Sequence, residues 1–232
     1  MIVLIIGGAK SSKSSYAEFY SSNLSKKGKG QLYYLATMNP YDSEDLKRIE
    51  NHLKNREKYD FKTIEKNRNL NEIFHKLSKE DTVLLDSLTS LVTNEMFVGK
   101  EFNESVHSNI LKDIKSLGTK VSNLVIVSDY VFSDGIKYDS YTESFKRELG
   151  KINCELASFS DVVIEASFGN LIFHKGEEVL EDENFLNIIT ADCVKTALEI
   201  CQQEKPDIAI LDVMLPDGNG FELMETLRSF TN

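Results

Sequence analysis

Short apolar runs alternate along the chain with longer segments that have helical periodicity. Residues 2–6 (IVLII) and 82–85 (TVLL) are two such runs, and each is bounded by polar residues or glycine. Runs of this length are typical of strands buried on both faces of a parallel sheet. Between the runs, apolar residues recur every three or four positions, as in residues 110–117, which predicts covering helices. We therefore expect an α/β fold with a mainly parallel sheet covered by helices on both faces.

The same patterns predict the remaining elements of the first three quarters of the chain. Further strands are expected at residues 31–37, 61–64, 123–128, 161–165 and 171–173, and helices at 44–58, 70–77, 88–97 and 145–159. In the helix at 44–58, an apolar stripe is formed by Leu46, Ile49 and Leu53. A cationic row on a different face repeats every four residues, at Arg48, His52 and Arg56.

The first apolar run leads into a loop that resembles a phosphate-binding loop. The loop reads Gly7-Gly8-Ala9-Lys10-Ser11-Ser12-Lys13-Ser14 and opens a predicted helix. In this geometry backbone N–H groups and the helix N-terminus surround phosphates. Lys13 would reach the phosphates and the Ser14 hydroxyl would bind Mg²⁺. The sequence therefore predicts a P-loop NTPase fold, with an ordinary strand-to-helix turn as the alternative.

Two positions qualify this interpretation. Ser12 stands where the pattern G-x-x-x-x-G-K-[ST] has its second glycine, so its side chain could crowd a phosphate or strain the backbone. Asp86 ends the strand at 82–86, where a carboxylate commonly faces the Mg²⁺ held by the loop serine. Asp86 could instead cap the helix that follows it.

Charge and cysteine content restrict the possible classes of protein. The 232 residues carry a net charge of −10, and 13 of the 37 acidic but only 3 of the 27 basic residues lie from Glu177 onward, which leaves 24 of each before it. This shift predicts a domain boundary near Gly176, and the absence of a basic patch argues against nucleic-acid binding. No apolar run approaches the ~20 residues of a membrane span. Three cysteines without metal-ligand spacing are expected to be free thiols in the cytoplasm.

Several segments together resemble one enzyme family. They are the loop with the following YAE, then YLATM, RIENHLKNR, TIE, VLLDSLTSLVTN, and FKRELGKIN ahead of SDVV. From Met1 to about Gly176 the chain resembles the adenosylcobinamide kinase/adenosylcobinamide-phosphate guanylyltransferase family of cobalamin biosynthesis. The most specific part is R-I-x-x-H-x-x-x-R downstream of the phosphate loop.

The resemblance implies a bifunctional transferase. It would phosphorylate adenosylcobinamide with ATP or GTP, and then move GMP from GTP onto that phosphate through a guanylyl-histidine. His52 would be the nucleophile, because it matches the family's histidine in that motif; a solvated histidine on a charged helix is the alternative. A neutral imidazole can attack phosphorus near pH 7, and neighbouring arginines favour that neutral form. Mg²⁺ would be held by Ser14 and Asp86. The resemblance also implies a homo-oligomer, with a trimer expected. Implied nucleotide contacts are Gly7, Gly8, Ala9, Lys10, Ser11, Ser12, Lys13, Ser14, Ala36, Thr37, Met38, Leu53, Lys54, Asn55, Arg56, Glu65 and Asp86.

The chain departs from the family at residues 129–132, which read DYVF, and at 144–147, which read SFKR. Two alternative functions therefore stay open: a nucleotide-binding protein that has lost catalysis, and an enzyme with guanylyltransferase activity alone. Radiolabelled substrates would distinguish these alternatives. The remaining histidines, His75, His107 and His174, have no partner evident in sequence and are expected to be surface or packing residues.

The acidic tail resembles part of a different protein. A strand is expected at 187–192 and a helix at 194–203, and residues 206–223 resemble the phosphoacceptor strand and loop of a response-regulator receiver domain. This resemblance places Asp212 at the phosphorylated position. The Lys and Thr/Ser of later receiver strands are missing, so we expect residues 177–232 to be an incomplete βαβα receiver-like fragment with poor phosphorylation at Asp212. In the alternative without catalysis, this fragment would serve as an interaction surface.

Overall fold

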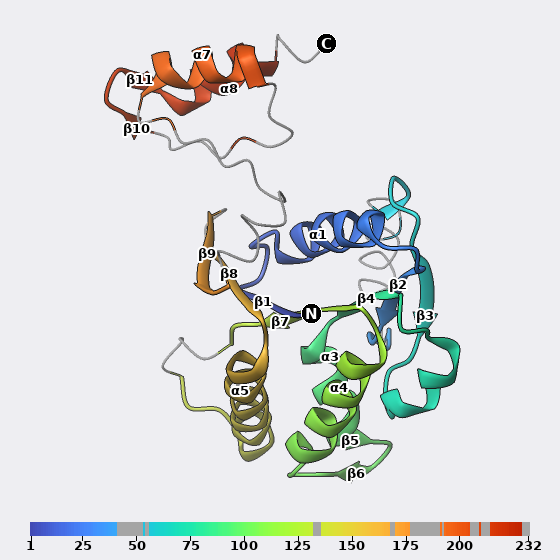
Figure 1. Cartoon of the computed structure of the whole chain (residues 1–232). Coiled ribbons are helices and arrows are strands. Elements are labelled where there is room, and N and C mark those ends of the chain that lie inside the picture. The colour runs from blue at the N-terminus through green and yellow to red at the C-terminus, as the bar shows by residue number, and fades with distance from the viewer. Residues whose placement is uncertain are drawn as a thin grey trace. The chain divides into compact units, whose positions relative to one another are not determined.

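The computed structural model describes residues 1–40, 53, 56–131, 136–167, 170–176, 191, 193–204, 209 and 214–228. The chain divides into two compact units, Met1–Leu180 and Glu181–Asn232. Figure 1 shows the elements of both units.

A seven-stranded sheet organises the described part of the first unit. Its strands are β1 (Ile2–Gly7), β2 (Leu32–Ala36), β3 (Lys62–Glu65), β4 (Thr82–Asp86), β7 (Asn123–Asp129), β8 (Val162–Ser167) and β9 (Asn170–Lys175). The order is β3-β2-β4-β7-β1-β8-β9, and all strands are parallel except β9, which pairs antiparallel with β8. The mainly parallel sheet expected from the apolar runs is confirmed. β3 is the edge strand at one side of this sheet.

Helices cover both faces of the sheet (Figure 1). Helix α1 (Lys13–Lys27) lies on one face, against β1, β4 and β7. The other face is covered by α3 (Leu88–Met96), α4 (His107–Lys120) and α5 (Ser140–Phe159). The central strands β1 and β7 are buried between these layers, and Leu124 to Val127 are fully inaccessible. Burial on both faces explains why these strands are continuous apolar runs rather than alternating ones.

The observed elements differ from the expected ones in three places. Residues 70–77, expected as a helix, form the 3₁₀ helix η1 (Leu70–Lys76). A small hairpin of β5 (Phe97–Val98) and β6 (Glu101–Phe102) was not expected. Helix α5 begins at Ser140, five residues before the expected start at residue 145, because the Asp139 carboxylate accepts hydrogen bonds from two backbone N–H groups of its first turn.

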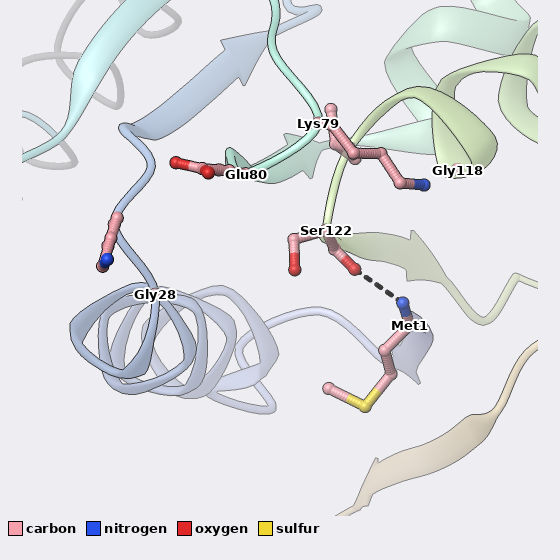
Figure 2. Close-up of a pocket in the computed structure, with 8 residues that line it drawn as sticks. Met1, Gly28, Lys79, Glu80, Gly118 and Ser122 are labelled. Atoms are coloured by element: carbon pink, nitrogen blue, oxygen red, sulfur yellow. Dashed lines mark hydrogen bonds between the residues drawn. The ribbon is translucent and has the colours of Figure 1, made fainter.

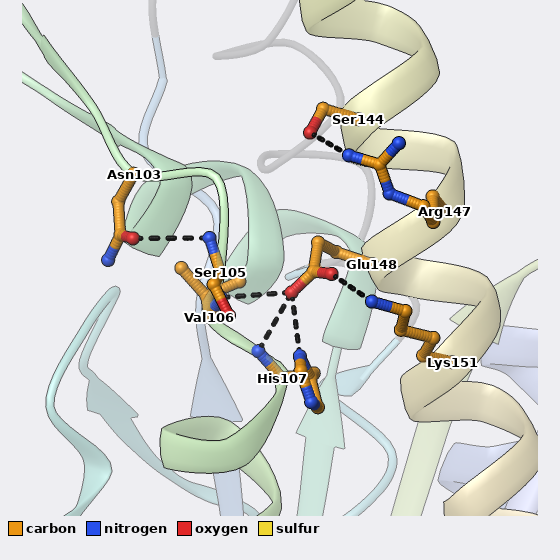
Figure 3. Close-up of polar contacts among 8 residues, drawn as sticks. All are labelled: Asn103, Ser105, Val106, His107, Ser144, Arg147, Glu148 and Lys151. Carbon is orange, nitrogen blue, oxygen red and sulfur yellow. Dashed lines mark hydrogen bonds and ion pairs between the residues drawn. The ribbon is translucent and has the colours of Figure 1, made fainter.

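The buried carboxylate of Glu148 in α5 is hydrogen-bonded to the start of α4 (Figure 3). Glu148 accepts hydrogen bonds from the backbone N–H of Val106 at 3.0 Å and of His107 at 3.2 Å, and from Lys151 Nζ at 3.0 Å. Its Oε2 atom also lies 2.9 Å from His107 Nδ1. Val106 occupies the N-cap position of α4 and has no capping side-chain group, so Glu148 of α5 caps the helix in its place.

These contacts correct the expectation that two histidines are unpartnered. His107 pairs with Glu148, and Nε2 of His174 lies 2.9 Å from Glu165 Oε2. Both pairs join residues that are far apart in sequence or lie on adjacent strands, so sequence spacing could not indicate them. His75 is exposed, as expected.

The second unit contains a small set of described elements. These are α7 (Val194–Glu204), β10 (Met214–Leu215), β11 (Gly218–Asn219) and α8 (Gly220–Arg228). The helix expected at 194–203 is confirmed, and it begins where the Asp217 carboxylate accepts hydrogen bonds from the backbone N–H groups of Val194 and Lys195. The strand expected at 187–192 and the residue Asp212 lie outside the described residues.

The state of the cysteines and the character of the helices follow the sequence-based expectations. Cys154, Cys193 and Cys201 are free thiols. Among the helices in the described ranges, none combines the length and the apolar character required to cross a lipid bilayer.

Candidate functional site

The predicted phosphate loop lies at the carboxyl end of β1, between that strand and the start of α1. Gly7 pairs with Asp129 of β7 on one side and with Ala166 of β8 on the other. A Cβ atom at Gly7 would lie 2.6 Å from the Ala166 carbonyl oxygen, so the close approach of β8 requires glycine here. A Cβ atom at Gly8 would meet no atom within 4 Å in the described structure, so the loop leaves open space above it.

Ser12 occupies a backbone conformation that normally favours glycine. Its φ is +67° and its ψ is 10°, at the N-cap of α1, and its side chain makes no capping hydrogen bond. This geometry supports the interpretation that Ser12 stands at a glycine position of the loop. The strain anticipated from the sequence is therefore a feature of the backbone itself. The first turn of α1 is left without a side-chain cap and without acidic residues, which suits an anion.

Lys13 is held by two oxygen atoms at the loop. Its Nζ atom donates a hydrogen bond to the Gly8 carbonyl at 3.0 Å and forms an ion pair with Asp129 Oδ1 at 2.7 Å. Asp129 ends β7, and its backbone N–H donates to Thr89 Oγ1 of α3 at 3.0 Å. The loop lysine is thus mostly buried and neutralised by a carboxylate of the neighbouring strand.

The carboxylate of Asp86 is the centre of a second group of polar residues. Asp86 ends β4, and its Oδ2 atom accepts a hydrogen bond of 2.9 Å from the Tyr34 hydroxyl of β2. The Arg56 guanidinium carbon lies 3.4 Å from the centroid of the Tyr34 ring, and Arg56 is only 6% exposed. Ser87, and not Asp86, caps α3, through a hydrogen bond from the Ser90 N–H. The alternative role of Asp86 as a helix cap is therefore wrong.

Glu18 of α1 is a third ionisable residue in this region. It is 2% exposed, and its Oε1 atom has no hydrogen-bond partner among the described residues. Burial, opposed by the positive charge of Arg56 and reinforced by the negative charge of Asp86, raises the pKa of Glu18 to about 7. Burial and the adjacent Asp86 carboxylate also raise the pKa of the Tyr34 hydroxyl. The guanidinium of Arg56 thus lies against the face of the Tyr34 ring, and its positive charge interacts with Glu18.

Thr37 links the end of β2 to the start of α3. Its hydroxyl donates to the Ser87 carbonyl at 2.7 Å and accepts from the Ser87 N–H at 2.8 Å. The Asn94 side-chain amide donates to the Thr37 carbonyl at 2.8 Å. Thr37 is fully buried, so it fixes the backbone at this edge of the site rather than presenting its side chain to solvent.

The remaining predicted residues are spread along the carboxyl edge of the sheet. Glu65 pairs with Ala36 at the end of the edge strand β3, four strands from β1 or roughly 19 Å at the usual strand spacing, and is exposed. Leu53 is 47% exposed, so it does not pack as the apolar stripe predicted. Among the residues of this segment that the structure describes, Arg56 is buried. Met38 is half-buried, whereas Ala9 and Lys10 are exposed. Outside the described residues lie His52, Lys54, Asn55 and Asp212.

The oxygen donors at this edge are suitable for Mg²⁺ bound together with phosphate. Ser14 follows Lys13 in the first turn of α1. Asp129 ends β7, the neighbour of β1 in the sheet order, and Asp86 ends β4, which lies next to β7. Hydroxyl and carboxylate oxygens are the ligands that Mg²⁺ prefers, and it commonly takes its other ligands from water and substrate phosphates. Within the described ranges no group of three or more His, Cys, Asp or Glu side chains could hold a metal by itself. The donor set therefore fits a metal that arrives with a nucleotide.

A cavity of about 470 Å³ lies at the opposite edge of the sheet (Figure 2). Its lining includes Met1, Glu80 and Ser122, which precede β1, β4 and β7. The Met1 amino group donates to the Ser122 carbonyl at 2.6 Å within it. Ligands of parallel sheets bind at the carboxyl ends of the strands, so we place the candidate site at the phosphate loop and not in this cavity.

Sequence reasoning missed three residues of this site. Asp129 follows an apolar strand as Asp86 does, and that shared pattern could have identified it. Tyr34 and Glu18 carry no comparable signal. Tyr34 and Glu18 matter because of their interactions with Asp86 and Arg56. The tertiary structure brings these residues together, and sequence spacing does not indicate it.

Comparison with known proteins adds independent findings. A family model described as cobinamide kinase / cobinamide phosphate guanyltransferase matches residues 3–172, and a model of the response regulator receiver domain matches residues 170–232. The bifunctional adenosylcobalamin biosynthesis protein CobU of Escherichia coli (strain K12) is 27% identical over 175 residues, which cover 70% of this chain and 93% of that protein. The sensory transduction protein LytT of Bacillus cereus is 50% identical over 42 residues, which are 18% of this chain and 17% of LytT. Among solved structures, the ATPase domain of G40P is 15% identical, covers 71% of this chain and 68% of its own, and gives a TM-score of 0.44.

Proposed function

This chain belongs to the cobinamide kinase / cobinamide phosphate guanyltransferase family, a family of transferases, and we propose that it carries out both reactions of that family. In the first, it phosphorylates adenosylcobinamide with ATP or GTP. In the second, it transfers GMP from GTP to adenosylcobinamide phosphate and yields adenosylcobinamide-GDP. The observation that carries this proposal is the buried Lys13 of the phosphate loop, which lies beside Asp129 at the carboxyl edge of the sheet.

The loop residues from Gly7 to Ser14 would bind the nucleotide phosphates. The open space above Gly8 and the uncapped first turn of α1 support this assignment. Phosphate oxygens would accept hydrogen bonds from the backbone N–H groups of that first turn. Lys13 would exchange its bond to Asp129 for bonds to phosphate. The Ser14 hydroxyl and the Asp86 carboxylate would hold Mg²⁺, which neutralises charge on the phosphate oxygens when bound.

His52 is the proposed nucleophile of the second reaction. An unprotonated imidazole nitrogen would attack the α-phosphorus of GTP, forming a P–N bond as the bond to pyrophosphate breaks. An oxygen of adenosylcobinamide phosphate would then attack the same phosphorus, and cleavage of the P–N bond would regenerate His52. The spacing of four residues between His52 and Arg56 supports this role, since a helix places both on one face. Arg56 is buried beside Tyr34 and near Asp86, within the same edge of the sheet.

Labelling with α-³²P GTP and Mg²⁺ tests the nucleophile. We expect a covalent, acid-labile and base-stable label on the wild-type protein, and no label on His52→Ala. His75→Ala is the matched control, because His75 is exposed, lies on η1 and is not among the residues proposed to bind the nucleotide, so the variant should label normally. Label that persists in His52→Ala, or a wild-type protein that never becomes labelled, contradicts the guanylyl-histidine.

One observation favours a second candidate, an enzyme with guanylyltransferase activity alone. The positive φ of Ser12 places a side chain where the loop pattern has glycine, and that side chain could obstruct the γ-phosphate during phosphoryl transfer. Adenosylcobinamide and ATP without GTP would distinguish the two candidates. Phosphorylated product supports the bifunctional enzyme, whereas its absence in wild type and its appearance in Ser12→Gly support the second candidate.

We further propose that residues 1–176 form the nucleotide-binding domain and residues 177–232 an acidic receiver-like fragment. The two family matches, which meet near residue 170, and the division of the chain into two compact units support this arrangement. We also propose a homo-oligomer, expected to be a trimer, that works in the cytoplasm. Light scattering of the purified chain measures the oligomeric state directly.

A further inference from the structure

Tyr34 contacts two functional candidates at once. Its hydroxyl donates a 2.9 Å hydrogen bond to Asp86 Oδ2, and its ring lies beneath the Arg56 guanidinium at 3.4 Å. Tyr34 is itself 5% exposed and projects from β2, which pairs directly with β4. One rigid side chain therefore joins the proposed metal ligand to the segment that carries the proposed nucleophile.

Each contact restrains a group that would otherwise be poorly fixed. The Asp86 carboxylate could adopt several rotamers, and a hydrogen bond from a buried hydroxyl selects one of them. The Arg56 side chain is long, and a buried guanidinium requires compensation by acidic groups and by an aromatic face. The Tyr34 ring provides the aromatic face, and the charge of Arg56 interacts with that of Glu18.

We propose that Tyr34 is a positioning residue that holds the Asp86 carboxylate and the Arg56 guanidinium in one arrangement, so that metal binding and guanylyl transfer are both organised by the same side chain. This inference rests on the proposed function, because it assigns Asp86 to Mg²⁺ and Arg56 to the guanylylation segment. Tyr34 touches neither nucleotide nor metal in this scheme. It acts through its two neighbours.

A purely structural explanation is that Tyr34 only fills the core, and that its buried hydroxyl donates a hydrogen bond to the nearest acceptor. The two explanations differ in what Tyr34→Phe and Tyr34→Leu should do. Phenylalanine keeps the ring beneath Arg56 and removes only the hydrogen bond to Asp86. Leucine removes both contacts. If Tyr34 only fills the core, the effect of each variant should follow the loss of side-chain volume alone. If Tyr34 is a positioning residue, loss of the hydrogen bond and loss of the ring should each have a separate effect on binding or labelling.

The test compares wild type, Tyr34→Phe, Tyr34→Leu and the control Tyr33→Phe. Tyr33 is the adjacent residue of β2, is partly buried and packs against the apolar core, so its variant loses a hydroxyl from the same strand without touching Asp86 or Arg56. Equilibrium binding of a fluorescent GTP analogue is measured over a series of Mg²⁺ concentrations, independently of any reaction. Labelling of the protein by α-³²P GTP then gives the rate and the half-saturating GTP concentration, and thermal unfolding reports stability.

We expect Tyr34→Phe to need about tenfold more Mg²⁺ for half-maximal binding, the usual effect of losing an outer-shell partner of a metal ligand. At saturating Mg²⁺ its labelling rate should return close to that of wild type. Tyr34→Leu should show the same Mg²⁺ shift and in addition a labelling rate about tenfold lower that Mg²⁺ does not restore. Tyr33→Phe should match wild type in both measurements.

Three results would overturn the inference. They are an unchanged Mg²⁺ dependence in Tyr34→Phe, identical behaviour of the phenylalanine and leucine variants, and losses that follow thermal stability across all four proteins. Failure of the proposed function has a different signature. In that case the wild type is never labelled by GTP, while the Mg²⁺-dependent binding curves still compare Tyr34→Phe with Tyr33→Phe.

Discussion

The ammonium group of Lys13 lies 2.7 Å from a carboxylate oxygen of Asp129, although the two residues are 116 positions apart in the sequence. Their strands are neighbours, because β7 pairs in register with β1 up to Gly7 and Asp129. The lysine that would meet the phosphates is thus bound to an internal anion. A nucleotide must compete with that anion.

Asp129→Asn should therefore strengthen nucleotide binding when Mg²⁺ is absent. Removing the competing charge should favour GTP by about 1 kcal/mol, or about fivefold in dissociation constant, since the pair is only partly buried. Fluorescence titration of a GTP analogue in EDTA measures this change. Lys13→Met is the control and should bind more weakly than wild type. Equal affinities of Asp129→Asn and wild type would show that phosphate and Asp129 do not share Lys13.

Ser12 should tolerate glycine but not a β-branched residue. At φ +67°, valine should lower the free energy of unfolding by about 1–3 kcal/mol. Glycine relieves the strain but increases the freedom of the unfolded chain, so Ser12→Gly should stay within about 1 kcal/mol of wild type. Urea unfolding measures both, with Ser12→Ala as the control that keeps Cβ. A valine variant as stable as wild type would contradict the left-handed backbone at this position.

Glu148 should make the stability of the first unit depend on pH in the acid range. Burial alone would raise its pKa, but hydrogen bonds from His107, Lys151 and the backbone N–H groups of His107 and Val106 lower it from 4.5 to about 2. The folded pKa is depressed, so the stabilisation is fully present above pH 4.5 and is lost as pH falls toward 2. After allowing for solvent screening, Glu148→Gln should cost about 2 kcal/mol at pH 7.

The measurement is the difference in unfolding free energy between wild type and Glu148→Gln at several pH values. This difference should shrink toward zero between pH 4.5 and 2. Glu155→Gln, an exposed position of the same helix, is the matched control and should show no such trend. A difference that stays constant over this range would mean that the pKa of Glu148 is the same in the folded and unfolded states.

In the second unit, Asp217→Ala should loosen the start of α7. Its carboxylate accepts hydrogen bonds from the first backbone N–H groups of that helix, at 2.6 Å from Val194 and 3.1 Å from Lys195. These hydrogen bonds also lower the pKa of Asp217. We expect faster hydrogen exchange at the amides of Val194 and Lys195 in the variant, and unchanged exchange in α4 of the first unit. If the amides of Val194 and Lys195 exchange at the same rate in the variant as in wild type, Asp217 does not cap α7.

Much of the fold could be predicted from the sequence, because buried parallel strands must be apolar on both faces. The strands β1, β4 and β7 and the helices α3 and α4 follow from that requirement. The hairpin of β5 and β6 could not be predicted, since two-residue strands carry too few positions to establish a pattern. The early start of α5 depends on the cap at Asp139, which precedes the apolar stripe.

The candidate site was predictable where a local motif encodes it. Gly7, Ser12 and Lys13 lie together because a loop of eight residues determines their positions. The strand-end pattern marks Asp129 as a candidate, but its position beside Lys13, like the positions of Tyr34 and Glu18, is set by the strand order β2-β4-β7-β1 rather than by sequence distance. The exposure of Leu53 shows the same limit: helical periodicity identifies two faces but not which face the tertiary structure buries.

The edge strand β3 also has a consequence for the behaviour of the protein at high concentration. Its outer backbone groups could pair with a strand of another molecule, but it is only four residues long and carries exposed Lys62 and Glu65. Short edges with charged residues resist such intermolecular pairing. Replacing both charges by valine would remove this protection, and the variant should form β-rich aggregates under conditions in which the wild-type protein remains dispersed.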